Sequence, residues 1–314
     1  MKVPPIQILS LFPMVNSAIA PNFKTYDWQT YSCAYYQSGD SNSAATPLLL
    51  IHPIGVGLSA RFWDRFCRNW VEGGNDRPIF APDLLGCGKS AMPHATYLPE
   101  DWASQLAFFI KEVIGQPVIV VVQGALLPVA LELVHYHPEQ VKGLVFSGPP
   151  AWPLMIEDTA DWLQRIRWNL FDSPLGWGFY VYACQEGFLR QFSIDQLFAR
   201  AEDVDREWLD TLREGCQSFE SRHAVYAFLS GFWRRDYRKI MAAIAQPVLV
   251  LMGDEASSIS REGDQETPDQ RLAAYETALS QVQLESMPGR NVLPYESTVA
   301  FVTFVRSFIA NYQI

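Results

Sequence analysis

The chain has 314 residues, of which 49% are hydrophobic and 18% charged, and its formal net charge at pH 7 is −10. These proportions are typical of a folded globular protein and argue against a disordered chain. An acidic chain without a lysine- or arginine-rich run is a poor candidate for binding nucleic acid or an anionic membrane surface. At this length we expect a single core that carries an inserted subdomain.

The cysteines and the N-terminal segment bear on where the protein resides. The five cysteines are scattered and odd in number, and no two have C-x-x-C spacing, so the sequence indicates neither a disulfide framework nor a zinc site. We expect a reducing, cytoplasmic setting, and no apolar run is long enough to span a bilayer. Residues 1–25 are expected to form an irregular N-terminal arm. The apolar stretch 6–15 and the triplet Ala18-Ile19-Ala20 loosely imitate a secretory signal, so cleavage and export stay open.

The predicted elements begin with residues 26–36, whose pattern is typical of an antiparallel hairpin leading into a sheet. Apolar runs without polar alternation then predict strands that are buried on both faces. These runs are residues 47–51, 78–81, 117–122, 144–146 and 247–252. Helical spacing of apolar residues appears between them, at 102–114 and 128–135. Strands and helices in alternation predict an α/β fold, with a mostly parallel, doubly wound sheet.

Residues 151–240 interrupt this alternation. The segment is rich in aromatic residues and contains no convincing strand, and Pro174 and Gly176 punctuate it. We expect several short helices that form a lid inserted over the ends of the strands. The core would then consist of residues 26–150 and 241–314. The aromatic residues could line an apolar pocket or simply pack the lid helices onto the core, and both readings stay open.

Glycine-bearing turns follow four of the predicted strands. They read LLLIHPIGVG at 48–57, PDLLGCGKS at 82–90, PVIVVVQGALLP at 117–128 and PVLVLMGDE at 247–255, with MPGRNVLP following at 287–294. In this order and spacing the motifs resemble the α/β-hydrolase family, specifically its lidded members related to epoxide hydrolases and small-ester hydrolases. The resemblance runs from about residue 26 to the C-terminus and implies an α/β-hydrolase fold with an inserted helical lid.

The resemblance also assigns positions to a catalytic triad. In the family the turn at 122–126 is the nucleophile elbow G-x-S-x-G, whose middle residue attacks the substrate. That position is Gly124 here, and glycine has no side chain with which to attack. The resemblance places the acid at Ala256, although Asp254 is near, and the base at Val292.

Two absences in the sequence do not depend on the register of that comparison. No histidine follows His223, and no Ser, Cys or Asp lies between Ser104 and Ser147. A serine hydrolase needs both a nucleophile and a general base. We therefore expect the standard hydrolytic chemistry to be lost.

Three functional hypotheses follow. The first is a non-catalytic member of the family that retains a pocket between core and lid for an apolar small molecule. The second is a hydrolase of small esters or epoxides with displaced chemistry, built on Cys87 with His52 or His94. The third is a structural or assembly partner that binds another protein through its lid. The expected pocket residues are His52, Pro53, Ile54, Gln123, Gly124, Ala125, Trp152 and Val292.

The remaining histidines and cysteines have simpler interpretations. His52 is expected to order its loop by hydrogen bonding, and Cys87 to be a small packing residue. His135 and His137 lie at the end of a predicted helix, where a cation complements the helix dipole. No histidine, cysteine or carboxylate pattern indicates a metal site, and nothing in the sequence calls for a cofactor.

Overall fold

The computed structural model describes residues 23–40 and 43–314. The expected arm at 1–25 and its signal-like stretch therefore lie almost wholly outside the described residues. The first described element, β1, begins at Phe23. Within the described ranges every helix is too short or too polar to cross a bilayer.

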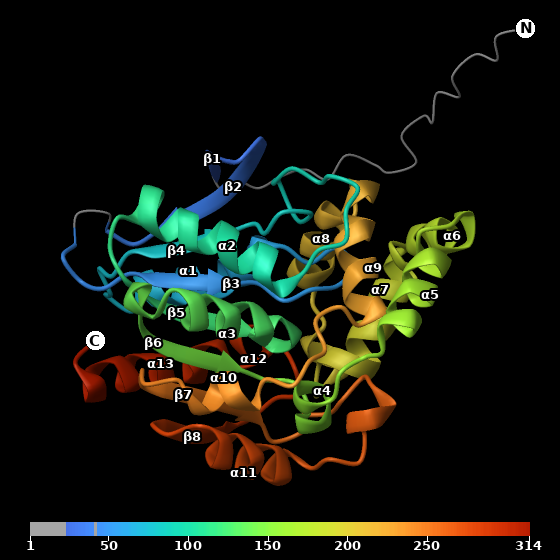
Figure 1. Cartoon of the computed structure of the whole chain (residues 1–314). Helices are drawn as coiled ribbons and strands as arrows, with labels where there is room; N and C mark the ends of the chain where they lie inside the picture. Colours follow the sequence, from blue (N-terminus) through green and yellow to red (C-terminus); the bar gives the residue numbers. More distant parts are fainter. Residues whose placement is uncertain (1–22, 41–42) are drawn as a thin grey trace, which may run out of the picture.

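An eight-stranded sheet forms the centre of the molecule, in the order β1-β2-β4-β3-β5-β6-β7-β8 (Figure 1). The first two strands form an antiparallel hairpin, β2 pairs antiparallel with β4, and all later neighbours pair in parallel. The fold class predicted from the apolar runs is therefore confirmed. The strands are β1 (Phe23–Trp28), β2 (Tyr31–Ser38), β3 (Leu48–Ile51), β4 (Ile79–Pro82), β5 (Val118–Gln123), β6 (Val141–Ser147), β7 (Val248–Gly253) and β8 (Val282–Met287).

Helices cover both faces of this sheet. One buried cluster joins the sheet to α2, α3 and α11, and a second joins the opposite face to α1, α12 and α13. Along β5, Val120 faces the first cluster and Val121 the second, which is why the strand is apolar throughout. These helices are α1 (Asp64–Glu72), α2 (Pro99–Phe109), α3 (Leu127–Tyr136), α11 (Pro268–Ala278), α12 (Leu293–Glu296) and α13 (Thr298–Tyr312).

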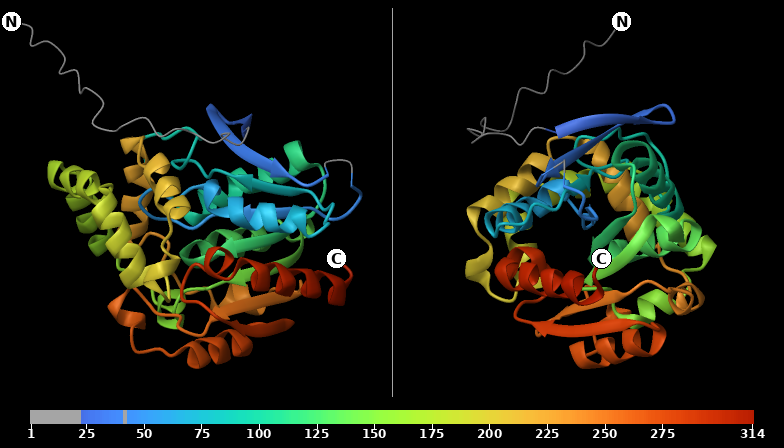
Figure 2. Two further views of the ribbon diagram at one scale, coloured as in Figure 1. Left: turned by 180° about the vertical axis from the view of Figure 1, so that it is seen from behind. Right: turned by 90° about the vertical axis from the view of Figure 1, so that its left-hand side faces the viewer.

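An inserted helical region, α4–α10, separates β6 from β7 and gathers at the carboxyl ends of the parallel strands (Figures 1 and 2). Its last helix, α10, returns to the core and lies against α3. The insertion of a helical lid is thus confirmed. The helices are α4 (Trp152–Ile156), α5 (Asp161–Phe171), α6 (Pro174–Ala183), α7 (Glu186–Phe192), α8 (Arg206–Gly215), α9 (Arg222–Ser230) and α10 (Arg238–Ala242).

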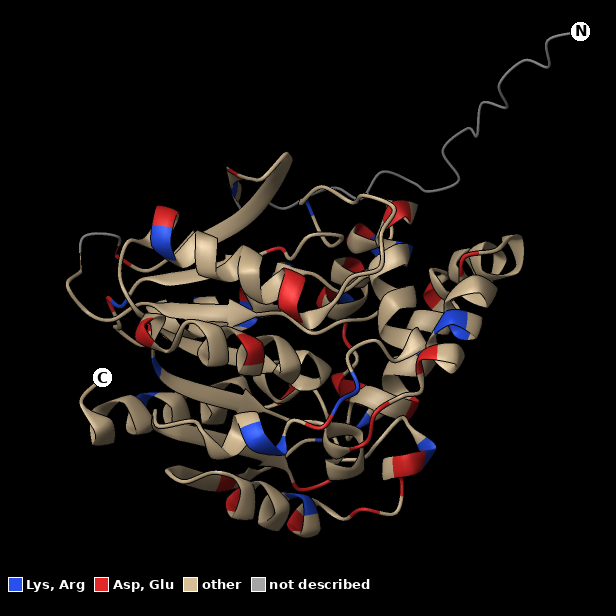
Figure 3. Ribbon diagram, viewed as in Figure 1, with Lys and Arg blue, Asp and Glu red and all other residues tan. Residues whose placement is uncertain are grey.

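Helix α8 is one of the elements that fasten the lid to the core. Arg65 of α1 pairs with Asp205, the residue that caps α8, at 2.6 Å and with Glu207 at 2.9 Å. The backbones also touch, because a Cβ at Gly57 would overlap the backbone of Leu212 and a Cβ at Gly215 would overlap that of Gly57. Only glycine allows two backbone segments to approach each other so closely. Elsewhere, charges of both signs are dispersed over the view in Figure 3.

Candidate functional site

The turn from β5 into α3 is the centre of the candidate site. Gln123 ends the buried strand, one helical turn at Gly124–Leu126 follows, and α3 begins at Leu127. Gly124 has a φ of 63°, in the left-handed region that is costly for residues with a Cβ. A Cβ built on Gly124 would meet nothing within 4 Å, so the space in front of this residue is open. Gly124 therefore lies in a left-handed conformation at a junction between a strand and a helix, the setting in which a nucleophile elbow is found.

Hydrogen bonds tie this turn to the loops after β7 and β8. The Gln123 amide Nε2 donates to the carbonyl oxygen of Asn291 at 2.7 Å, and the Ser147 hydroxyl donates to Gln123 Oε1 at 2.6 Å. Asn291 Oδ1 in turn accepts from the Ser257 backbone N–H at 3.3 Å. The three loops named by the resemblance are thus brought together at one end of the sheet.

The three predicted triad positions lie directly beside this network. Gly124 follows Gln123, Ala256 precedes Ser257 and Val292 follows Asn291 in the sequence. Ala256 and Val292 are both buried. Asp254, the alternative acid, has an exposed side chain and forms a backbone bond to Met287. The apolar side chains of Ala256 and Val292 offer no proton acceptor.

His52 orders the loop after β3, as the sequence predicts. Its Nδ1 lies 2.7 Å from the carbonyl oxygen of Pro53, and its Nε2 accepts the backbone N–H of Leu84 at 3.2 Å. The imidazole is fully buried, and this burial lowers its pKa to about 4. Both ring nitrogens are therefore occupied, and the ring is neutral at pH 7. Pro53 contributes no N–H with which to stabilise an oxyanion.

The loop after β4 is built around a buried carboxylate. Asp83 accepts the backbone N–H groups of Ala60 and Lys89, each at 2.8 Å, while its burial raises its pKa to about 6. Gly88, with a φ of 57°, lies so close to this carboxylate that a Cβ would overlap it. The buried Cys87 is adjacent, and burial together with Asp83 raises the pKa of its thiol. A nucleophilic cysteine needs the opposite shift.

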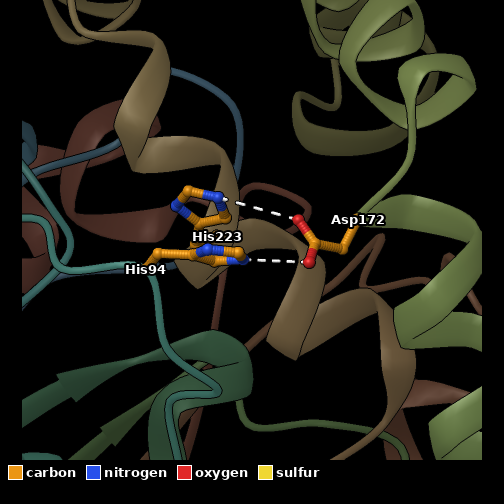
Figure 4. A group of neighbouring side chains, drawn as sticks. All are labelled: His94, Asp172 and His223. Atoms are coloured by element: carbon orange, nitrogen blue, oxygen red, sulfur yellow. Dashed lines mark hydrogen bonds and ion pairs between the residues drawn. The ribbon is translucent and has the colours of Figure 1, made fainter.

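His94 lies on the surface between core and lid. Its Nε2 is 2.9 Å from Asp172 Oδ2, and its ring stacks on that of His223 with centroids 4.3 Å apart (Figure 4). Within the described residues neither His52 nor His94 is hydrogen-bonded to Cys87. These contacts argue against a pairing of that thiol with either histidine as a base.

The expected pocket residues fall into two groups. His52, Pro53, Gln123 and Val292 are buried, whereas Ile54, Gly124, Ala125 and Trp152 are only half-buried. Ile54, Ala125 and Trp152 border the same apolar cluster as the lid residues Trp168, Phe228 and Phe232. Apolar residues of the core and of the lid therefore pack against one buried cluster.

A separate cleft of about 520 Å³ lies between the loop after β4 and the C-terminal end of α8. Its lining is polar and includes Lys89 and Glu214, whose charged groups are 3.7 Å apart. None of the expected pocket residues lines this cleft. Sequence reasoning missed it because its two walls are far apart in the chain.

Comparison with known proteins gives a consistent result. A model of the alpha/beta hydrolase family matches residues 48–303. The chain is 29% identical over 121 residues to the 2-hydroxymuconate semialdehyde hydrolase of Pseudomonas sp. (strain CF600). That alignment covers 38% of this chain and 42% of the relative, so the match spans less than half the length of the curated relative.

Two solved structures resemble nearly the whole chain. A malate-bound thermophilic esterase from Thermogutta terrifontis superposes with a TM-score of 0.70 at 17% identity, covering 93% of this chain and 98% of the esterase. The enol-lactonase from Burkholderia xenovorans LB400 gives a TM-score of 0.70 at 14% identity, covering 91% of this chain and 100% of the lactonase. At such identities the likeness shows the fold alone.

Proposed function

We propose that this chain, which belongs to the alpha/beta hydrolase family, is a non-catalytic member that binds an apolar small molecule between core and lid. One observation carries the proposal. The turn between β5 and α3, where the resemblance places the nucleophile, has Gly124 in a left-handed conformation. Without a side-chain oxygen, sulfur or carboxylate at this tip, no covalent intermediate can form there.

The surrounding side chains support the loss of triad chemistry. Val292 cannot take a proton from a nucleophile or from water, and Ala256 cannot orient a base. Preorganised backbone donors alone leave roughly 10³–10⁴-fold acceleration over water in serine proteases that lack the triad. This residual acceleration is small beside the rate enhancements of enzymes, so it would not make the chain an effective hydrolase.

A binding role is supported by the space in front of the turn. Small-molecule sites are mostly apolar concavities with a few placed polar groups. Here the half-buried Ile54, Ala125 and Trp152 supply apolar surface, and a Cβ on Gly124 would meet nothing within 4 Å. Removing the nucleophile leaves that space available for a ligand that is held and not cleaved.

Native mass spectrometry with small-molecule extraction tests the proposal on protein purified gently from its own source. We expect an apolar compound in stoichiometric amount, and we expect Trp152→Ala to reduce its occupancy. A matched control is Trp162→Ala, which changes an exposed lid tryptophan. Turnover of small aryl esters that Trp152→Ala abolishes and Trp162→Ala leaves intact would refute the non-catalytic reading.

Displaced hydrolysis built on Cys87 remains directly testable. Burial keeps this thiol protonated, so we expect Cys87→Ala to leave any measured ester turnover unchanged. Loss of turnover on this substitution, together with inactivation of the parent chain by a thiol-directed reagent, would favour an enzyme.

The lid surface favours a second candidate, in which another protein binds through α5 and α6. Trp162, Leu175 and Tyr182 are 65%, 76% and 62% exposed, which is unusual for large apolar side chains. The test is reconstitution of a complex from two purified chains, after a copurifying protein has been identified. Leu175→Ser should weaken that complex, whereas Val299→Ser, an exposed change on α13, should not.

A further inference from the structure

Three side chains of metal-ligand type meet where the lid contacts the core (Figure 4). His94 comes from the loop before α2, Asp172 directly follows the last residue of α5, and His223 lies in the first turn of α9. The Asp172 carboxylate faces both rings, with Oδ2 2.9 Å from His94 Nε2 and Oδ1 3.8 Å from His223 Nε2. One donor atom from each of the three residues lies within 4.8 Å of the others.

His223 supplies the second observation. Its side chain is 1% exposed, and neither ring nitrogen has a hydrogen-bond partner within the described residues. The nearest carboxylate oxygens, from Asp172 and Glu220, are both 3.8 Å away, beyond hydrogen-bond distance. Buried polar groups without partners are rare and costly, and an ion is one of the recognised ways to satisfy them.

We propose that His94, Asp172 and His223 form a binding site for a divalent transition-metal cation of the zinc class. Two imidazole nitrogens and one carboxylate oxygen suit Zn²⁺ and its neighbours, whereas Mg²⁺ and Ca²⁺ require oxygen ligands. Zinc holds histidine nitrogens and carboxylate oxygens at about 2.0–2.2 Å. The donor atoms, which lie within 4.8 Å of one another, would rearrange around the ion, and His94 has the most exposed side chain of the three.

Such a site would add a further link between the lid and the core to those made by α8. Asp172 and His223 belong to the lid, and His94 to the core. A cation bound by all three would therefore hold α5 and α9 against the loop before α2. Three protein ligands would leave one tetrahedral position for water. This site was not predicted from the sequence, because its ligands have none of the short spacings that mark metal motifs.

Calorimetric titration of the chelator-treated full chain with zinc chloride tests the proposal. We expect one Zn²⁺ per chain, a higher Tm on binding, and no comparable effect of magnesium chloride. His94→Ala should weaken zinc binding at least tenfold, and because His94 is exposed this variant is expected to fold. Asp172→Asn and His223→Gln should weaken binding at least as much.

The matched control is His135→Ala, which removes an exposed histidine on α3 outside the cluster. Its zinc affinity should equal that of the parent chain. The proposal is overturned if the parent chain binds no zinc at millimolar concentration. Equal zinc affinities for His94→Ala and His135→Ala would overturn it as well.

Discussion

The side-chain amide of Gln123 donates to the backbone carbonyl of Asn291 across 168 residues of sequence, at 2.7 Å. This bond connects the turn at the end of β5 to the loop after β8, where the family resemblance places a catalytic histidine. The amide oxygen of Gln123 is occupied as well, by the Ser147 hydroxyl. Gln123 thus fixes the relative positions of the loops at the candidate site through both of its polar atoms.

Replacing Gln123 with leucine should therefore destabilise the chain. The buried Ser147 hydroxyl and the half-buried Asn291 carbonyl would lose their partners, and such a loss costs about 1–3 kcal/mol for a buried group and less for a partly exposed one. We expect the free energy of unfolding, measured in urea, to fall by about 2–4 kcal/mol. Gln37→Leu is the control, because Gln37 only accepts from Lys24 at the surface. Equal losses for the two variants would contradict the assigned role of Gln123.

The substitution Gly124→Ser tests two effects at the turn, the conformational cost of a side chain at this position and the gain of a nucleophile. The new side chain has room, but the φ of 63° costs a non-glycine residue about 1–2 kcal/mol. We expect that loss of stability in urea unfolding, with no gain of esterase activity because Val292 supplies no base. Gly178→Ser is the control, since Gly178 lies within helix α6, outside the left-handed region, and its Cβ position is also open. Strong ester turnover by Gly124→Ser alone would show that a general base exists elsewhere.

Burial of His52 makes stability depend on pH. The ring binds a proton near pH 6.5 when unfolded but only near pH 4 when folded. Between these values the unfolded chain binds more protons, so the free energy of unfolding falls as the pH falls. His52 should account for a loss of about 3 kcal/mol between pH 7 and pH 4, at ~1.4 kcal/mol per pKa unit.

Urea unfolding of the parent chain and of His52→Gln over that pH range measures the effect. The difference in stability between them should shrink by about 3 kcal/mol from pH 7 to pH 4. Asp83 acts with the opposite sign. Its pKa is raised from 3.8 to about 6, so its ionisation costs stability as the pH rises through that interval. This contribution is common to both chains and cancels in the comparison. Parallel stability curves would show that His52 is not the titrating group.

A buried ion pair joins α11 to the start of the lid. Arg271 Nε lies 2.9 Å from Glu266 Oε2, and the Glu266 carboxylate also accepts the backbone N–H of Trp152 at 3.0 Å. Arg271→Ala would leave Glu266 charged and largely buried, which costs about 3–5 kcal/mol. The exposed pair of Arg238 with Asp236 is the control, and Arg238→Ala should cost no more than about 1 kcal/mol. Thermal unfolding of the two variants distinguishes these values.

The sequence predicted the central sheet well and its borders poorly. Strands such as β5 and β7 are buried on both faces and therefore consist of uninterrupted apolar residues. Strand β8 was missed because it lies at the edge of the sheet, where its residues are partly exposed and include Gln283 and Glu285. The beginning of β6 was missed because Lys142 and Gly143 interrupt its apolar run.

The candidate site was only partly predictable for a similar reason. The order of the motifs identified the turn at Gly124, because the local sequence of a buried strand followed by a helix determines that turn. The bond from Gln123 to Asn291 and the cluster of His94 with Asp172 and His223 depend on how distant segments pack. No short spacing in the sequence reports such contacts.

The close contact between Gly57 and Gly215 restricts which lid helices can move aside to admit a ligand. Two backbones that touch leave no clearance for sliding, and the ion pairs of Arg65 hold the same helix, α8, at its other end. Helix α8 is therefore held to the core at both of its ends. We expect a ligand to reach the space in front of Gly124 by displacing α5 and α6. Helix α8 is expected to keep its position against the core during this entry.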